Sequence, residues 1–361
     1  MSQTGRRYMV LALTLGARGL GQVWPNPAVG CVIAKEGRIV GRGWTQPGGR
    51  PHAETEALRQ AGEDARGATV YVTLEPCAHQ GQTPPCAEAL TAAGVARVVS
   101  AMEDPDPRVS GSGHARLTAA GIPVHTGLLA EAAAALQKGF LTRLRDGRPM
   151  VTLKLATSLD GRIATASGES SWITGPDARR AVHALRARHD GVLIGAGTAR
   201  TDDPMLTVRG IGAVRQPVRI VATSDLHLPR NGALARSATE VPLWLMTAAG
   251  TDPGFWPETG ARLFAVASKD RQIDPAEMLQ ALGAAGLTRV LCEGGGQLAA
   301  SLLRAGLVDE IVGFTAGLML GSEGRSATGP LMLAALADAP RFRLAGVDAV
   351  GGDVMHRWVR A

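Results

Sequence analysis

The 361-residue chain has few aromatic residues, because Phe, Trp and Tyr together make up only 4% of it. Proteins that bind single-stranded nucleic acid stack bases on aromatic side chains, so this scarcity argues against that class. The chain also lacks an apolar run of the roughly 18 residues that cross a bilayer. Arg6-Arg7 precede an apolar stretch over 8–15, but no small-residue cleavage site follows, which favours an amphipathic helix over a signal peptide. We expect a cytoplasmic protein with no membrane partner.

Four cysteines in 361 residues are too few for a disulfide scaffold and indicate metal binding, catalysis or core packing in a reducing compartment. Lysine and arginine exceed aspartate and glutamate by 38 to 32, and no long basic block concentrates the net charge of +6. This charge suits small anionic substrates such as phosphates as well as it suits nucleic acid, so it does not decide between them. At roughly 100–200 residues per domain, the length predicts two domains, or three at most.

Residues 1–146 alternate between strand and helix patterns, which predicts an α/β layered domain with a mostly parallel sheet. The hairpin at its edge joins two apolar, β-rich runs, 29–35 and 38–44, through Glu36-Gly37. The other predicted strands are 68–74, 96–101 and 122–125, and the predicted helices are 6–20, 53–61, 85–93, 113–120 and one long helix over 130–145.

The turn cluster Asp146-Gly147-Arg148-Pro149 marks the predicted domain boundary, and the second domain spans 149–361. Two strands after the last helix indicate an antiparallel end to an otherwise parallel sheet. The predicted strands are 150–157, 191–195, 218–222, 241–246, 289–292, 310–315, 341–347 and 354–359, and the predicted helices are 176–188, 275–285 and 297–305.

Three potential metal ligands lie near predicted helix starts in the first domain: His52, Cys77 and Cys86. One imidazole and two thiolates suit Zn²⁺ and leave its fourth position open for water, whose pKa zinc lowers to about 7. Both cysteines lie near helix N-termini, where the helix dipole favours thiolates. Glu54, two residues after the histidine, would carry the proton from water to a leaving amine.

Zinc nucleobase deaminases share the pattern H-x-E…P-C-x-x-C, and the first half of this pattern fits here. The two cysteines are instead separated by eight residues, 78–85. A purely structural zinc in a scaffold protein is an alternative, but such sites normally have four protein ligands. His79 is the one rival fourth ligand. A stand-alone nucleobase or nucleic-acid deaminase with a binding module is the other alternative.

Several motifs resemble the bifunctional deaminase/reductase family of riboflavin biosynthesis over about residues 6–358. In the first domain these are Asn26-Pro27-Ala28-Val29-Gly30-Cys31, His52-Ala53-Glu54, Thr73-Leu74-Glu75-Pro76-Cys77 and Thr83-Pro84-Pro85-Cys86. The long spacing between cysteines is typical of that family. The resemblance implies a cytidine-deaminase-like αβα domain followed by a dihydrofolate-reductase-like α/β domain with a mixed sheet.

The resemblance also implies the first reaction, a zinc-dependent hydrolytic removal of the 2-amino group of a diaminopyrimidinone ribosylamino 5′-phosphate. Zinc would be held by the histidine and the two cysteines, Glu54 would be catalytic, and Asn26 would contact the pyrimidine. Thr45 and Gln82 stand where family members commonly carry His and Lys or Arg. The substrate would then be held differently, by Arg50 or His79. Cys31 lies in an apolar strand and is expected to be a core residue.

No G-x-G-x-x-G fingerprint follows a first strand of the second domain, and Gly195-Ala196-Gly197-Thr198-Ala199-Arg200 matches it poorly. A better candidate is Leu291-Cys292-Glu293-Gly294-Gly295-Gly296-Gln297, where a strand leads through glycines into a helix. Backbone N–H groups in such a turn can bind a pyrophosphate. A tight turn without a ligand is the alternative, and Cys292 is expected to be a packing residue.

The second domain resembles the family's reductase domain at 153–162, 167–174 and 201–209, and that domain uses NADPH. Lys154, in an otherwise apolar strand, must face a cleft or a partner, and we assign it a catalytic role beside the sugar carbon that accepts hydride. The implied substrate contacts are Lys154, Ser170, Arg186, Leu206, Arg209 and Glu293. The implied cofactor contacts are Ala156, Trp172, Thr198, Asp202, Ser224, Gly295, Gly296, Gln297, Leu298, Ala299, Ala300 and Ser301.

The leading hypothesis is therefore one chain with two successive activities, deamination and then reduction to the ribitylamino product. Arg186 and Arg209 would bind a 5′-phosphate through charge-assisted hydrogen bonds. The alternative for Arg186 is a solvated helix face, which is the ordinary expectation on a helix that carries four arginines. The expected partners are small phosphorylated pyrimidines and no nucleic acid. The family tendency toward dimers or tetramers predicts a homo-oligomer. A preference for NADPH over NADH is not visible in the residues themselves.

Overall fold

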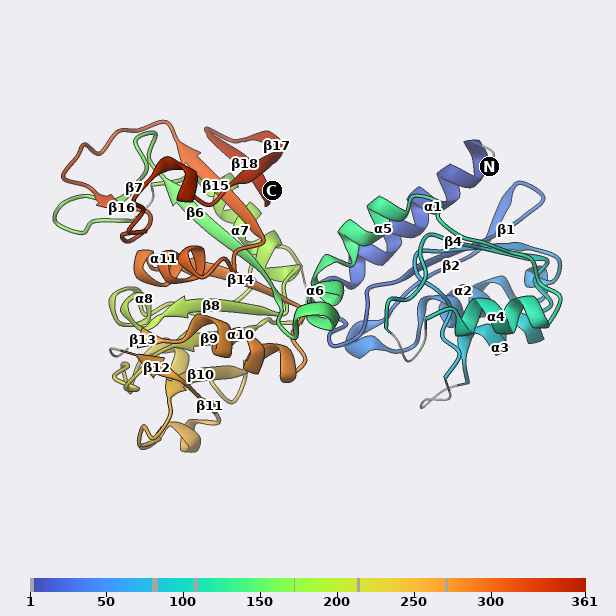
Figure 1. Cartoon of the computed structure of the whole chain (residues 1–361), viewed down its shortest axis with the longest axis horizontal. Coiled ribbons are helices and arrows are strands. Elements are labelled where there is room, and N and C mark those ends of the chain that lie inside the picture. Colours follow the sequence, from blue (N-terminus) through green and yellow to red (C-terminus); the bar gives the residue numbers. More distant parts are fainter. Residues whose placement is uncertain (1–2, 80–83, 107–109, 172, 213–214, 270–271) are drawn as a thin grey trace. The chain divides into compact units, whose positions relative to one another are not determined.

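The computed structural model describes residues 3–79, 84–106, 110–171, 173–212, 215–269 and 272–361. The chain divides into two compact units, Met1–Asp146 and Gly147–Ala361, and each is described by itself (Figure 1). No helix among the described residues is long and apolar enough to cross a membrane.

The first unit is built on a five-stranded sheet in the order β2-β1-β3-β4-β5. The strands are β1 (Gly30–Lys35), β2 (Arg38–Trp44), β3 (Thr69–Val72), β4 (Arg97–Ser100) and β5 (Val124–His125). The predicted hairpin is confirmed, with β2 at the edge. Because β1 also pairs antiparallel with β3, only the β3–β4 and β4–β5 pairings are parallel, so the prediction of a mostly parallel sheet is wrong.

Helices cover both faces of this sheet and give three layers. On one face, α1 (Gln3–Gly16) and α5 (Ala130–Leu136) pack in a cluster that includes Met9 and Ala133. On the other face lie α2 (Ala53–Ala61), α3 (Cys86–Ala92) and α4 (Ser112–Ala119). Their buried side chains form a second cluster, which includes the predicted core residue Cys31.

Helix α2 approaches β2 closely. A Cβ on Gly43 would lie 2.0 Å from the carbonyl oxygen of Ala53, so only glycine permits this contact. The approach fixes the first turn of α2, and His52 is the N-cap residue of that turn. The β1–β2 hairpin thus positions the part of the helix that carries the predicted metal ligand.

The single long helix predicted over 130–145 is wrong, because the structure has α5 and then α6 (Lys138–Asp146). Between them Gln137 leaves helical geometry, with ψ near 3°. Its buried side chain donates a 2.8 Å hydrogen bond to the carbonyl oxygen of Ala28. This contact joins residues 109 positions apart in the chain, and an Ala-rich helical pattern carries no sign of it. Helix α1 likewise ends at Gly16, and a short 3₁₀ turn, η1 (Ala17–Gly19), follows.

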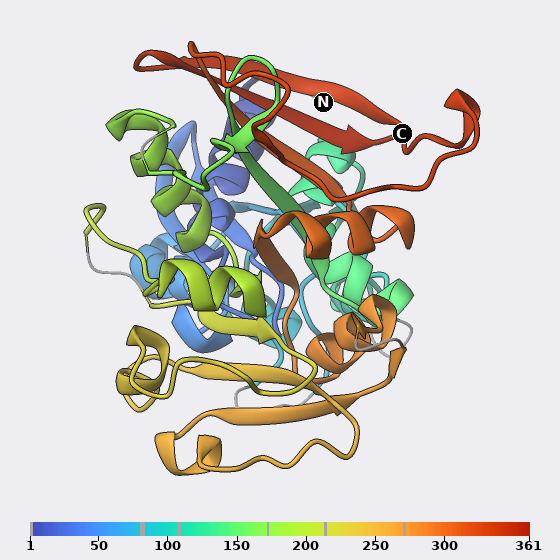
Figure 2. The same cartoon turned by 90° about the vertical axis from the view of Figure 1, so that its left-hand side faces the viewer.

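The second unit contains a nine-stranded sheet in the order β11-β10-β9-β8-β14-β6-β15-β18-β17. The seven strands from β11 to β15 run parallel, and β18 and β17 are antiparallel, as predicted. Figure 2 shows these last two strands in red at one edge. The bounds are β6 Met150–Thr157, β8 Gly191–Gly195, β9 Val218–Ala222, β10 Leu243–Ala248, β11 Arg262–Val266, β14 Arg289–Gly294, β15 Glu310–Ala316, β17 Phe342–Val350 and β18 Asp353–Arg360.

Helices α7 (Pro176–Ala187) and α11 (Gly296–Arg304) lie on opposite faces of this sheet. Helix α7 connects β6 to β8 in one direction along the sheet and α11 connects β14 to β15 in the other, and right-handed crossovers then require opposite faces. The other elements are α8 (Ala196–Asp202), α9 (Ala233–Arg236), α10 (Pro275–Ala284), the strand pairs β7 (Arg162–Ala164) with β16 (Arg325–Ser326) and β12 (Ser268–Lys269) with β13 (Gln272–Ile273), and the 3₁₀ turns η2 (Pro47–Gly49), η3 (Gly62–Ala65), η4 (Trp256–Thr259) and η5 (Leu336–Asp338).

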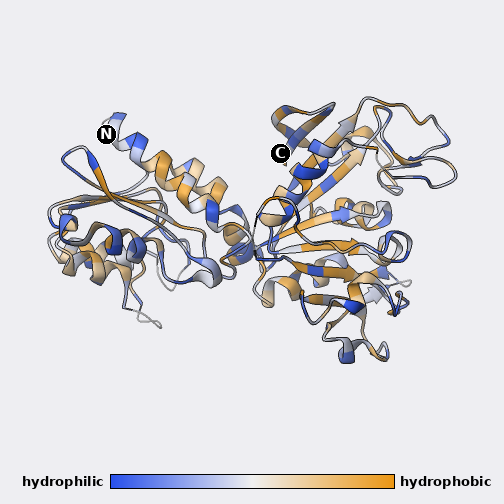
Figure 3. Cartoon of the chain, turned by 180° about the vertical axis from the view of Figure 1, so that it is seen from behind, coloured by the Kyte–Doolittle hydropathy of each residue, from blue (hydrophilic) through white to orange (hydrophobic). Residues whose placement is uncertain are grey.

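The start of the second unit is fixed by a buried ion pair. Arg148 donates to both carboxylate oxygens of Asp309, at 2.7 and 3.0 Å, and Asp309 also accepts the backbone N–H of Val151 at 2.8 Å. Both side chains of the pair are about one-tenth exposed. The inner strands of the sheet carry mostly hydrophobic residues (Figure 3).

Candidate active sites

The first site begins at the N-terminus of α2. His52 precedes the helix, and Glu54 lies in its first turn with only 3% of its surface exposed. The segment before it bends through the 3₁₀ turn Pro47–Gly49, and a Cβ on Gly49 would lie 1.9 Å from the side-chain nitrogen of Asn26. The predicted pyrimidine contact, Asn26, is therefore held against the turn that leads to His52.

The two predicted cysteine ligands meet this histidine. His52 Nδ1 lies 3.3 Å from Cys86 Sγ and 3.6 Å from Cys77 Sγ, and the three ligand atoms lie within 4.8 Å of one another. Tetrahedral zinc, with Zn–S of about 2.3 Å and Zn–N of about 2.0 Å, separates its nitrogen and sulfur ligands by about 3.5 Å. The donor set thus fits zinc in both chemistry and spacing.

Hydrogen bonds around Cys77 favour its thiolate. The Cys86 thiol and the His52 ring donate to the Cys77 sulfur. The backbone N–H of Cys86, at the N-terminus of α3, also donates to this sulfur, with an N–Sγ distance of 3.3 Å. Together these hydrogen bonds lower the pKa of Cys77 to about 4. Burial acts in the opposite direction on Glu54 and raises its pKa to about 7, although the nearby His52 charge lowers it. A carboxyl with this pKa can both take and give a proton near neutral pH.

Thr45, one of the two residues that depart from the family pattern, does not join this cluster. Thr45 is buried, and its hydroxyl accepts the backbone N–H of Val29 at 3.0 Å, which is a structural contact. His79 is exposed and is not part of the metal-binding group that the described residues form. Gln82 lies outside the described residues.

Sequence analysis missed Glu75, which is 4% exposed and two residues before Cys77. Its carboxylate accepts four backbone N–H groups, from Asp104 at 3.1 Å, Gly111 at 3.0 Å, Gly113 at 2.7 Å and His114 at 3.2 Å. Glu75 therefore fixes the chain after β4 beside the cysteine segment. An acid that follows the apolar run Val70–Leu74 is the signal that could have identified it.

In the second unit, an ion pair joins α7 to β14. Arg186 Nε donates to Glu293 Oε1 at 2.5 Å and its Nη2 donates to Oε2 at 2.9 Å, with side chains 12% and 8% exposed. Burial alone would raise the pKa of Glu293, but the Arg186 hydrogen bond and the charges of Arg186, Lys154 and His183 hold it below its usual value. Arg186 is therefore not on a solvated helix face.

Lys154 lies on the neighbouring strand β6 and on the same face of the sheet as Glu293, because Leu153 pairs with Cys292 in register. Burial raises the pKa of Asp202, and the positive charge of Lys154 partly offsets that rise. Lys154 thus lies near a predicted substrate contact, Glu293, and a predicted cofactor contact, Asp202, which come from different parts of the chain.

His183 was also missed by sequence analysis. It lies one helical turn before Arg186 on α7, and its Nδ1 accepts the backbone N–H of Arg209 at 3.2 Å. Burial lowers the pKa of His183, and the charges of Arg186 and Arg209 lower it further. The Arg186 Nη1 also donates to the carbonyl oxygen of Thr207 at 2.9 Å. Helix α7 therefore holds the segment that carries the exposed Arg209 and the buried Leu206.

The predicted glycine turn places two helix N-termini together at the carboxyl ends of β8 and β14. A Cβ on Gly295 would lie 3.1 Å from Thr198 Oγ1 of α8. Neither α8 nor α11 has a side-chain cap, so backbone N–H groups of their first turns have no side-chain acceptor there. The arrangement suits an anionic group such as a pyrophosphate.

The remaining predicted contacts of the second unit are spread over several elements. Ala156 is half-buried on β6, and Ser170 is exposed. The Ser224 carbonyl oxygen accepts from the Thr251 hydroxyl at 3.0 Å. Along α11, Ala299 and Ala300 are fully buried, whereas Gln297 is exposed and Leu298 and Ser301 are half-buried. Trp172 lies outside the described residues. Cys292 is fully buried and packs in the core, as expected.

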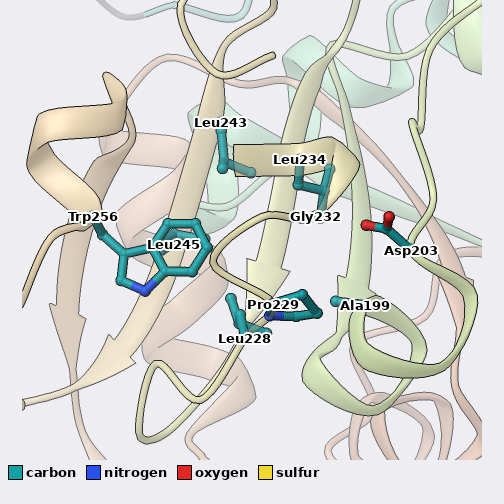
Figure 4. Close-up of a pocket in the computed structure, with 9 residues that line it drawn as sticks. All are labelled: Ala199, Asp203, Leu228, Pro229, Gly232, Leu234, Leu243, Leu245 and Trp256. Atoms are coloured by element: carbon teal, nitrogen blue, oxygen red, sulfur yellow. The ribbon is translucent and has the colours of Figure 1, made fainter. Parts of the chain in front are cut away.

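A small cavity lies away from these side chains, between α8, α9 and the strand β10 (Figure 4). Its volume of about 10 Å³ is near the minimum for one water molecule. On one side Asp203 accepts the backbone N–H of Ala233 at 2.7 Å, which caps α9. The cavity is a packing gap in an apolar cluster and is too small for a substrate or cofactor.

Comparison with known proteins agrees with these two sites. The family model for the cytidine and deoxycytidylate deaminase zinc-binding region matches residues 2–102, and that for the RibD C-terminal domain matches residues 149–356. The fold and the His/Cys/Cys group define the class: a zinc-binding deaminase domain joined to a reductase domain, with the two folds predicted from the sequence.

The relatives then identify the family. The chain is 46% identical to the riboflavin biosynthesis protein RibD of Escherichia coli, over 98% of this chain and 99% of the relative. It is 42% identical to that of Haemophilus influenzae, over 96% of this chain and 95% of the relative. The chain therefore belongs to the RibD family of riboflavin biosynthesis and is a bifunctional deaminase and reductase.

Solved structures agree over the whole chain. Acinetobacter baumannii RibD is 39% identical, with a TM-score of 0.90 and 99% of both chains covered. A deaminase/reductase from Thermotoga maritima, whose name gives a diaminohydroxyphosphoribosylaminopyrimidine deaminase and a 5-amino-6-(5-phosphoribosylamino)uracil reductase, is 33% identical with a TM-score of 0.88 and 99% of both chains covered.

Proposed function

We propose that the first unit removes the 2-amino group of 2,5-diamino-6-ribosylamino-4(3H)-pyrimidinone 5′-phosphate by hydrolysis. The second unit then reduces 5-amino-6-(5-phosphoribosylamino)uracil to the ribitylamino product. Family membership and the two reactions in the name of the Thermotoga maritima relative support this order of substrates. The observation that carries the first assignment is the group of His52, Cys77 and Cys86 beside the buried Glu54.

In the deaminase unit, His52, Cys77 and Cys86 would hold zinc. A zinc ion with three protein ligands lowers the pKa of water at its open position and so supplies a nucleophile at neutral pH. Glu54 accepts the proton of that water and delivers it to the leaving amine, and its pKa near 7 suits both transfers. Asn26, held against Gly49, orients the pyrimidine.

In the reductase unit, NADPH would bind along the glycine turn and the contacts predicted with it on β6, α8 and α11, including Ala156, Thr198 and Asp202. NADPH supplies a hydride to C1 of the open-chain or iminium form of the sugar. Arg186 and Arg209 bind the 5′-phosphate, and Glu293 holds the Arg186 guanidinium in place. Lys154 lies at the reacting carbon. Ser170 and Leu206 complete the substrate contacts.

We further propose that the chain is a homo-oligomer and acts in the cytoplasm. The family tendency to dimers or tetramers supports the first statement. The cysteine content supports the second, because the two thiol ligands require a reducing compartment to stay reduced.

Substitution of Glu54 tests the proposed function. Glu54→Gln keeps the shape of the side chain but cannot accept a proton, so we expect ammonia release to fall by about 10² to 10⁴-fold. Zinc content and NADPH oxidation with the deaminated intermediate should be unchanged. The matched control is Glu56→Gln on the same helix, whose carboxylate pairs with Arg59 at 2.9 Å. Ammonia release at the wild-type rate by Glu54→Gln would exclude Glu54 as the residue that transfers the proton.

A further inference from the structure

A long connection between two strands of the second unit has little regular structure. It runs from 317 to 341, between β15 and β17, and its regular elements are the short strand β16 and the 3₁₀ turn η5. Connections in compact domains are usually about 4–6 residues long, and much longer ones are often functional. The first part of this connection, residues 317–330, contacts elements that carry predicted cofactor contacts. We call residues 317–330 the strap, and Figure 1 shows its strand β16 beside β7.

One end of the strap is held by the turn that follows β6. The carboxylate of Asp160 accepts the backbone N–H groups of Leu320 at 3.1 Å and of Gly321 at 2.8 Å. It also accepts the hydroxyl of Ser158 at 2.6 Å, and because Ser158 is only 1% exposed, this bond fixes the Asp160 side chain. The Ser158 hydroxyl and the strap N–H groups lower the pKa of Asp160 to about 2, so the side chain is ionised at neutral pH.

The middle of the strap lies along β7 and the residue before it. Arg162 Nη1 donates to the hydroxyl of Ser326 at 2.8 Å, and the Ala327 N–H donates to the carbonyl oxygen of Gly161 at 3.3 Å. A Cβ on Gly324 would lie 2.9 Å from Cγ of Arg162, so the two segments are in close contact there. The strap is therefore bound along the turn after β6 and does not extend into solvent at this point.

The other end of the strap lies on the glycine turn. The Gly329 N–H donates to the carbonyl oxygen of Gly296 at 2.9 Å, and a Cβ on Gly329 would lie 3.0 Å from Oε1 of Gln297. Gly296 and Gln297 are both predicted cofactor contacts at the start of α11. The strap thus packs against the glycine turn at Gly296, whereas Thr198 of α8 packs against it at Gly295.

The strap therefore connects two places where we expect the cofactor to bind. Ala156 lies near the end of β6, just before the turn that carries Asp160, and Gly296 begins α11. Because β6 and β14 are parallel neighbours, the turns that follow them lie at the same edge of the sheet. A strap that is already fixed loses little conformational freedom when a ligand binds beside it. We infer that the strap forms one wall of the NADPH site and that Asp160 is the positioning residue that holds it there.

This inference rests on the function proposed for the second unit, and Asp160→Asn tests it in the full chain. The amide keeps the shape of the side chain but replaces one acceptor oxygen with an NH₂ group, which cannot accept the strap N–H groups. Loss of a hydrogen bond to a charged group should raise the NADPH dissociation constant, measured by the fluorescence of bound NADPH, about ten-fold or more. The KM for NADPH should rise equally, with kcat at saturating NADPH and ammonia release unchanged.

The matched control is Asp338→Asn. The Asp338 carboxylate accepts the Ala335 N–H at 3.1 Å in the same connection but outside the strap, so this variant should bind NADPH as the wild type does. A purely structural role for Asp160 predicts a different result: urea unfolding of Asp160→Asn would shift while its NADPH dissociation constant stayed at the wild-type value. That result overturns the inference, and so does an equal rise in the dissociation constant in the two variants.

Hydrogen exchange of the wild type needs no substitution. NADPH should slow the exchange of backbone amides in peptides that cover 317–330 as well as in those that cover the glycine turn. Protection of the glycine turn alone overturns the role of the strap and leaves the proposed function intact. A wild-type chain that does not bind NADPH, with neither segment protected, contradicts the proposed function and the inference together.

Discussion

The two units build their sites in different ways. In the first, His52 and Glu54 come from the start of α2, and the two cysteines come from before and at the start of α3. The three ligand atoms already lie within 4.8 Å of one another. In the second, the corresponding side chains come from β6, α7, β14 and the segment after α8. A metal site depends on a few donor atoms at fixed spacing, whereas a site for a phosphorylated substrate and a cofactor depends on many long-range contacts. Loss of one side chain should therefore abolish the activity of the first site, whereas it should only reduce the activity of the second.

Removal of a metal ligand should produce the largest difference between the two activities. Cys77→Ala leaves two of the three ligands, so we expect loss of stoichiometric zinc and a fall in ammonia release on the order of 10³-fold or more. NADPH oxidation with the deaminated intermediate should stay at the wild-type rate. Zinc content by metal analysis and the two activities are measured on the same preparation. Cys31→Ala, a buried cysteine outside the metal group, is the control and should keep its zinc.

Removal of one partner of the buried pair should damage only the second unit. Arg186→Met leaves the Glu293 carboxylate buried without its partner, which costs about 3–5 kcal/mol of unfolding free energy. Denaturant unfolding should show one transition shifted and the deaminase activity retained, with a large loss in reductase kcat/KM. Arg180→Met on the same helix breaks the exposed pair with Asp177 and should cost less than about 0.5 kcal/mol. Equal effects of the two substitutions would contradict the role of the buried pair.

A buried histidine gives the second unit its own pH dependence. His189 is 4% exposed and burial lowers its pKa to about 3, against about 6.5 in the unfolded chain. Between those values the unfolded chain binds a proton that the folded unit does not, so stability is full above pH 6.5 and falls as pH is lowered. We expect a loss of about 2 kcal/mol from about pH 7.5 to 5. His189→Gln should flatten this slope in urea unfolding, and an unchanged slope would exclude His189 as its source.

The smallest expected effect concerns His183, which holds the backbone of Arg209. Leucine cannot accept that N–H, so His183→Leu should raise the reductase KM about ten-fold, the equivalent of one hydrogen bond, with little change in kcat. Glutamine can accept it through its side-chain oxygen, so His183→Gln should restore KM. Steady-state kinetics with the deaminated substrate measure both. A KM that rises equally in the two variants would indicate a packing role instead.

The two units also differ in which of their features could be predicted from the sequence. The grouping of His52, Cys77 and Cys86 beside Glu54 could be predicted because metal-ligand chemistry restricts both residue type and local order. The antiparallel end of the second sheet followed from two strand patterns after the last helix, whereas the strand order was not predicted. An acid after an apolar run marks Glu75 as unusual, but its role and that of His183 could not be predicted, because they depend on backbone N–H groups 29–39 and 26 residues away. The break at Gln137 depends on a bond to Ala28 that no helical pattern contains.

The pair of Arg148 and Asp309 has a practical consequence for dissecting the chain. A fragment that begins at 149, where the second domain was predicted to start, would remove the guanidinium and with it both of its hydrogen bonds to the buried Asp309. Such a truncation would lose stability for a reason unrelated to its catalytic residues. An expression fragment that starts at Gly147 keeps the pair intact and allows the reductase to be assayed alone.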